Sequence, residues 1–115
     1  MKKRRTVLWL DDLREVPEST AEKEYILVRS FGDFTDWISK NGLPDELDLD
    51  HDLGCTTDGK PEKTGMDCLK YAIEFHMASQ GASLPKLVIH SANPVGGENM
   101  RAYYDSYKRF LLTDS

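Results

Sequence analysis

Short apolar runs bounded by polar residues constrain this chain more than any other feature. Residues 6–10 (TVLWL) are almost continuously apolar and are followed at once by Asp11 and Asp12. Such a run is typical of a strand that is buried on both faces of a parallel sheet. Comparable short runs occupy residues 25–28, 47–50 and 87–89. The sequence therefore predicts about four strands.

Most of the segments between these runs carry apolar side chains at helical spacing. Asp33 is expected to cap a helix that buries Phe34, Trp37 and Ile38 and stops at Gly42. Two later helices are expected, the last of them after a hinge at residues 96–97. The first of the two would bury Met66, Leu69, Ala72, Ile73 and Met77. The second would bury Met100, Tyr103, Tyr104, Tyr107, Phe110 and Leu111. Residues 13–24 are polar, contain a proline and predict at most one helical turn. This order predicts an α/β fold, with a parallel sheet of about four strands flanked by helices.

Length and composition set the class of protein. The chain has 115 residues, of which 39% are hydrophobic and 10% aromatic, so we expect one domain over residues 1–115. The net charge of −5 argues against a broad nucleic-acid-binding surface. No apolar run approaches the roughly 20 residues that span a bilayer, so we expect a cytoplasmic protein without a membrane partner. Cys55 and Cys68 are expected to be free thiols.

Polar clusters follow three of the four predicted strands, at the end of the sheet where ligands of such folds bind. Asp11 and Asp12 follow the first strand, residues 50–52 (DHD) follow the third, and residues 90–93 (HSAN) follow the fourth. Carboxylates this close together raise one another's pKa unless a cation binds between them. The sequence therefore predicts a divalent metal, Mg²⁺ or Mn²⁺, on Asp11, Asp12 and Asp50, and adding a histidine ligand would favour a transition metal.

Histidines beside these acids suggest acid–base chemistry. His51 and His90 occupy equivalent places after consecutive strands, and either one is a candidate general acid or base near neutral pH. Asp52 is a further catalytic candidate. Phosphate oxygens would be bound by donors from Ser91, Asn93 and the loop residue Thr57. Two residues receive no such role: His76 is interpreted as a hydrogen-bonded core histidine, and Asp48 is left without a function.

These residues resemble the receiver domain of bacterial response regulators, through Asp11 and Asp12 after the first strand, Asp50 after the third, and Ser91 after the fourth. The resemblance implies that Asp11 and Asp12 bind magnesium, that Asp50 accepts a phosphoryl group and that the Ser91 hydroxyl senses it. Receivers also have a first helix and a fifth strand bearing a lysine. The sequence shows neither, so we expect a receiver-like (flavodoxin-like) fold that lacks both.

The stretches WLDDLR, DLDHDLG and VIHSANPVG are more similar to the cyclic-phosphate-processing receiver-like domains. That resemblance implies a role in processing cyclic phosphates of nucleotides or RNA ends. We therefore expect a metal-dependent phosphoesterase whose partner is a small anionic phosphate ligand or an RNA end, with protein partners left open. Two alternatives remain, a receiver phosphorylated on Asp50 and a module that senses a nucleotide without catalysis.

Overall fold

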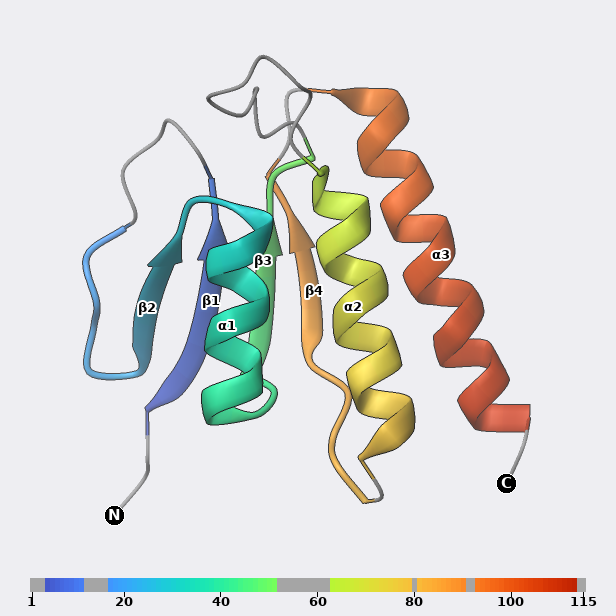
Figure 1. Cartoon of the computed structure of the whole chain (residues 1–115), viewed down its shortest axis with the longest axis horizontal. Helices are drawn as coiled ribbons and strands as arrows, with labels where there is room; N and C mark the ends of the chain where they lie inside the picture. Colours follow the sequence, from blue (N-terminus) through green and yellow to red (C-terminus); the bar gives the residue numbers. More distant parts are fainter. Residues whose placement is uncertain (1–3, 12–16, 52–62, 80, 91–92, 114–115) are drawn as a thin grey trace.

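The computed structural model describes residues 4–11, 17–51, 63–79, 81–90 and 93–113. These residues form four strands and three helices (Figure 1). The elements are β1 (Arg5–Leu10), β2 (Lys23–Val28), α1 (Phe31–Asn41), β3 (Glu46–Leu49), α2 (Gly65–Ala78), β4 (Lys86–Ile89) and α3 (Pro94–Thr113). None of the described helices is both long and apolar enough to span a bilayer.

The strands form one parallel sheet in the order β2-β1-β3-β4. The chain moves outward from β1 to β2 and then crosses to β3 on the other side of β1, so the switch point lies between β1 and β3. This is a receiver-like α/β fold, as the sequence predicts. The described residues between β1 and β2, 17–22, contain no helix, and the described part of the chain contains no fifth strand.

The core lies between the helices and one face of the sheet. Every second strand residue points into it, which is the period expected of a strand. The buried members on the strands are Leu8, Leu10, Val28, Leu47, Leu49 and Leu87, and those on the helices are Phe34, Ile38, Cys68, Leu69, Ala72, Ile73, Met100, Tyr104 and Tyr107. Cys68 is buried and forms no disulfide with a described residue, whereas Cys55 lies outside the described residues.

The alternate strand residues form the second face of the sheet, which carries polar and aromatic side chains. Trp9 and Asp48 are register partners across β1 and β3, and Val7 and Glu46 are partners one step earlier. Asp48 and Glu46 are only 7% and 3% exposed. Lys23 on β2 reaches the carboxylate of Glu46 at 3.5 Å. Two buried acids on one short strand therefore need partners on this face.

The two ends of α1 bear on two predictions, of which the first is wrong and the second is confirmed. The N-cap of α1 is Ser30, whose hydroxyl accepts a hydrogen bond from the backbone N–H of Asp33 at 3.1 Å, so Asp33 lies in the first turn and does not cap the helix. A serine side chain reaches the third N–H of a helix well, and the carboxylate at that position still favours the positive end of the helix. Gly42 ends α1 with a φ of 82°, a left-handed conformation that suits glycine, as predicted.

The last two helices also differ from the prediction. Helix α3 begins at Pro94, so Gly96 and Gly97 lie inside its first turns and form no hinge. Met77 and Phe110 are 60% and 53% exposed, although both fit the apolar spacing. They lie near the ends of α2 and α3, beyond the reach of the sheet. His76 is hydrogen-bonded as predicted: its ring nitrogens lie 2.7 Å from the Tyr107 hydroxyl and 2.8 Å from the Ala82 carbonyl.

Side chains of α3 cover the outer edge of β4. The backbone N–H groups of Lys86 and His90 donate to the carbonyls of Asp45 and Leu49, so the peptide groups of Leu87, one residue after Lys86, point to the open edge. The Arg101 guanidinium donates to the Leu87 carbonyl at 2.9 Å, and the hydroxyl of Tyr104 donates to the Pro85 carbonyl at 2.7 Å. Helix α3 thus supplies partners that a further strand would otherwise supply.

Candidate metal centre

The sheet register brings Asp11, Asp50 and His90 into one row. Trp9, Asp48 and Val88 are neighbours across β1, β3 and β4 and point to the same face. Two residues further along each strand, the next side chains on that face belong to Asp11, Asp50 and His90. The backbone hydrogen bonds between the strands continue to this point: the N–H of Asp50 donates to the Leu10 carbonyl, and the N–H of His90 donates to the Leu49 carbonyl.

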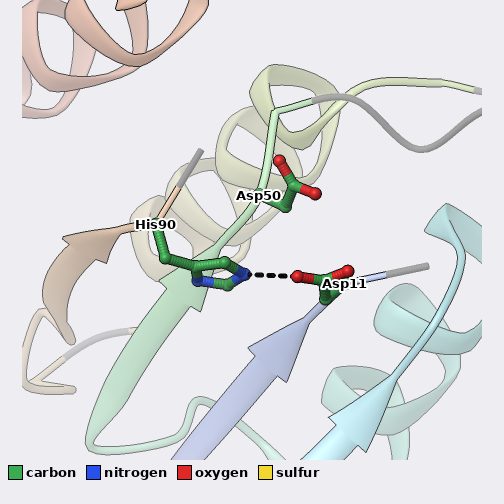
Figure 2. Close-up of side chains that lie close together, drawn as sticks. All are labelled: Asp11, Asp50 and His90. Atoms are coloured by element: carbon green, nitrogen blue, oxygen red, sulfur yellow. Dashed lines mark hydrogen bonds and ion pairs between the residues drawn. The ribbon is translucent and has the colours of Figure 1, made fainter. Parts of the chain in front are cut away.

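The three side chains converge (Figure 2). One ligand atom from each, a carboxylate oxygen of Asp11 and of Asp50 and a ring nitrogen of His90, lie within 4.8 Å of one another. Asp11 is only 1% exposed. A carboxylate so deeply buried needs a positive partner. The described cluster lies at the carboxyl edge of the sheet beside the switch point between β1 and β3, where the fold places ligands.

The His90 ring is held from three sides. Its Nε2 lies 3.1 Å from Oδ2 of Asp11, and its Nδ1 lies 2.5 Å from Oδ1 of Asp48. The indole of Trp9 stacks on the ring, with centroids 4.2 Å apart and planes within 10°. His90 thus reaches from β4 across β3 to the end of β1, and its orientation is fixed by two carboxylates and one aromatic face.

The surroundings of His90 change its pKa. Burial alone lowers the pKa of an imidazole, but the hydrogen bond to Asp48 and the negative charges of Asp48, Asp11 and Asp50 outweigh it. The pKa of His90 is therefore raised above 6.5. With a proton on each ring nitrogen, His90 donates to both carboxylates and supplies the positive charge that the buried acids require.

The donor set fits a divalent cation. Carboxylate oxygens suit Mg²⁺ and Mn²⁺, and an imidazole nitrogen in the same cluster adds affinity for transition metals. Asp11 and Asp50 would hold the ion, with the His90 ring beside it. The identity of the metal does not follow from these contacts.

Asp48 is the member of the site that sequence reasoning missed. An acid in the middle of a short buried strand is a signal in itself, because burying a carboxylate without a partner is costly. The spacing was a second signal, because Asp48 and Asp50 are two residues apart and must share a face. Asp48 contacts Nδ1 of His90, the nitrogen that faces away from Asp11.

His51 and His90 are not equivalent, contrary to the expectation from the sequence. Because Leu49 pairs with Ile89, His90 aligns with Asp50, and His51 lies one residue further on. A shift of one residue turns a strand side chain to the opposite face. The His51 ring accordingly lies toward α3, where a Cβ at Gly96 would be 2.5 Å from the ring. Its backbone carbonyl accepts a hydrogen bond from Gly65 N–H at 2.8 Å.

The other predicted site residues lie beyond these contacts. Asp12, Asp52, Thr57 and Ser91 are outside the described residues, so their predicted roles stay predictions. Asn93 precedes α3, and its side-chain oxygen accepts a hydrogen bond from Gly96 N–H at 2.9 Å, which caps the helix.

Comparison with known proteins identifies the family. No curated protein and no solved structure matches the chain. Residues 6–106 match the family model of the cyclic-phosphate processing receiver domain. The match runs from β1 into α3 and includes all three residues of the described cluster. The chain therefore belongs to the cyclic-phosphate processing receiver domain family.

Proposed function

We propose that the protein is a divalent-metal-dependent phosphoesterase that opens a cyclic phosphate on a nucleotide or an RNA end. The observation that carries the proposal is the row of Asp11, Asp50 and His90, whose ligand atoms lie within 4.8 Å of one another in a chain of this family. The row lies at the carboxyl edge of the sheet, which is open to a small ligand in such folds.

Asp11 and Asp50 have the roles of metal ligands in this proposal, and Mg²⁺ or Mn²⁺ is the expected ion. A bound divalent cation neutralises phosphate charge and lowers the pKa of a coordinated water. The two carboxylates come from β1 and β3, on either side of the switch point, so they approach the phosphate from two strands.

His90 is the general acid that we propose for the leaving ribose oxygen. Hydrolytic opening of a cyclic phosphodiester forms a P–O bond to the oxygen of water and breaks the P–O bond to one ribose oxygen, and this departing oxygen needs a proton. Nε2 of His90 lies 3.1 Å from Oδ2 of Asp11, one of the two carboxylates proposed to hold the ion. Burial lowers the pKa of the ring, but the hydrogen bond to Asp48 and the nearby carboxylates raise it overall. His51 lies on the opposite side of β3, so the geometry favours His90 for this step.

Phosphate contacts complete the proposal. The side-chain amide nitrogen of Asn93, at the start of α3, is the donor that we propose for a non-bridging oxygen, together with the Ser91 hydroxyl and Thr57. Such donors stabilise the charge that develops on phosphorus-bound oxygens. The ligand is thus a small phosphate ester or the end of an RNA chain, and the −5 net charge disfavours a long nucleic-acid footprint.

Phosphorus NMR tests this function directly. The protein is incubated with Mg²⁺ or Mn²⁺ and a nucleoside 2′,3′-cyclic phosphate, and in parallel with RNA that ends in a cyclic phosphate. We expect ring opening that is lost in Asp50→Ala and His90→Ala and retained in Asp36→Asn, which changes an exposed acid on α1. His51→Ala decides between the two histidines. Metal binding with every cyclic phosphate intact would overturn the proposal and favour a signalling or sensing domain.

A further inference from the structure

Two costly features of the second sheet face meet at one side chain, His90. Asp48 is a carboxylate in the middle of a strand and is only 7% exposed. The indole Nε1 of Trp9 is buried and bonds to none of the groups that the structure describes. Both arrangements cost free energy, because each polar group loses water. Asp48 and Trp9 both contact the His90 ring.

We propose that Asp48 and Trp9 are positioning residues that clamp the His90 ring with Nε2 toward Asp11 and Asp50. This inference rests on the proposed function for its chemical purpose, but the clamp itself is a statement about one side chain. Asp48 acts at the ring edge and Trp9 at the ring face, so together they restrict both torsions of the histidine side chain.

The hydrogen bond that His90 Nδ1 donates to Asp48 fixes which ring nitrogen points into the site. A carboxylate on Nδ1 holds the proton there and leaves Nε2 to face the reacting groups, the arrangement by which carboxylates orient catalytic and metal-binding histidines. Asp48 and Asp50 share one face of β3, two residues apart. One short strand therefore supplies both a ligand of the cluster and the anchor of its histidine.

Trp9 restrains the ring plane. The rings are nearly parallel, 10° apart, at a centroid separation of 4.2 Å, so rotation of the imidazole about its Cβ–Cγ bond would collide with the indole. Tyr25 on β2 packs edge-on against the other side of this assembly, with its centroid 6.1 Å from that of Trp9. The indole is thus itself held in place across the sheet.

Glu46 provides a matched control. It is a buried carboxylate on the same face of β3, two residues before Asp48, but its ion pair is with Lys23. Asp48→Asn and Glu46→Gln remove the same charge from the same strand. Only the first removes a contact with His90, so a merely structural effect would be shared by both variants.

Imidazole NMR without substrate tests the clamp. In protein labelled with ¹⁵N-histidine, His90 should give one ring orientation with a protected Nδ1–H, whose signal is lost in Asp48→Asn and kept in Glu46→Gln. Identical His90 signals in Asp48→Asn and the unmodified protein would overturn the inference.

Tryptophan fluorescence gives a second readout. The chain has two tryptophans, so Trp37→Phe leaves Trp9 as the sole indole. The His90 ring is stacked on the Trp9 indole and so changes its environment, and we expect the emission of Trp9 to change in His90→Gln and in Asp48→Asn but not in Glu46→Gln. Unchanged emission in His90→Gln would show that the stack does not exist.

Kinetics separate the clamp from the reaction. With a cyclic phosphate as substrate, Asp48→Asn should lower kcat by roughly 10- to 100-fold with little change in KM. Trp9→Phe should retain most of kcat, and Trp9→Leu should not. Full activity in Asp48→Asn would refute the clamp. Spectra that show the clamp in a protein that opens no cyclic phosphate would refute the proposed function alone.

Discussion

Nζ of Lys23 lies 3.5 Å from Oε1 of Glu46, although the two strands that carry them are separated by β1. Val7 on β1 is the register partner of Glu46 and is fully buried. This ion pair therefore neutralises a buried carboxylate across an intervening strand.

Lys23→Ala should lower the free energy of unfolding by about 1–3 kcal/mol, because Glu46 would remain buried without its partner. Urea denaturation measures the change. Arg4→Ala is the control, because the Arg4–Glu24 pair is exposed on both sides and such pairs contribute about 0–1 kcal/mol. Equal effects in the two variants would show that burial of Glu46 does not matter.

Divalent cations should stabilise the protein. The two carboxylate ligands come from the ends of β1 and β3, so the site exists only in the folded chain and binding shifts the folding equilibrium. At a concentration of 100 times Kd the gain is about 2.7 kcal/mol. Thermal unfolding with Mn²⁺ or Mg²⁺ against a chelator measures it. The shift should vanish in Asp50→Asn and persist in Asp36→Asn; a shift that survives in Asp50→Asn would place the ion elsewhere.

The stability of the metal-free protein should depend on the protonation of His90. Its folded-state pKa is raised above the unfolded value of 6.5, so the stabilisation is fully present below about pH 6.5 and is lost as the pH rises through the folded-state pKa. Thermal unfolding between pH 5 and 9, in the presence of a chelator, follows this loss. His90→Gln should flatten the profile over that window, and an unchanged slope would assign the pH dependence to other groups.

Gly65→Ala should destabilise the protein strongly. A Cβ at this position would lie 2.0 Å from the carbonyl oxygen of Asp50, and a backbone atom cannot move aside as a flexible side chain can. We expect a cost of about 1–3 kcal/mol or more, measured by urea denaturation.

Gly97→Ala is the matched control. Among the described residues, a Cβ there meets only the Ile89 side chain, at 3.4 Å, and replacing a helical glycine by alanine gains roughly 0.5–1 kcal/mol. The two variants should thus change stability in opposite directions. Similar losses in both would contradict the close approach of α2 to Asp50.

Much of the fold could be predicted from the sequence, because the spacing of apolar residues and the turn-forming residues depend only on nearby positions in the chain. The strand at residues 6–10 and the stop at Gly42 are read from neighbours in the chain. The helix ends were less predictable, since Ser30 and Asp33 are both good capping residues and only the backbone path decides between them. Exposure of Met77 depends on where α2 outruns the sheet, which spacing does not reveal.

For the site as well, features set by neighbouring residues could be predicted, and features set by the pairing of strands could not. The sequence places Asp11, Asp50 and His90 directly after predicted strands. Whether their side chains lie side by side depends on the register between the strands. Register also separates His51 from His90, because pairing Leu49 with Ile89 offsets the two histidines by one residue. Asp48 had no assigned role for the same reason: its partner is 42 residues away in the chain.

The Arg101 side chain that bonds to the Leu87 carbonyl also bears on how the protein behaves when concentrated. An outer strand with unpaired backbone groups is a template for joining the sheet of another molecule, and a charged side chain lying on it blocks that growth. In the part of the chain that the structure describes, the β4 edge of the sheet meets Arg101 and Tyr104 of α3 and no further strand. Resistance to edge-to-edge aggregation on that side of the molecule therefore depends on side chains of one helix.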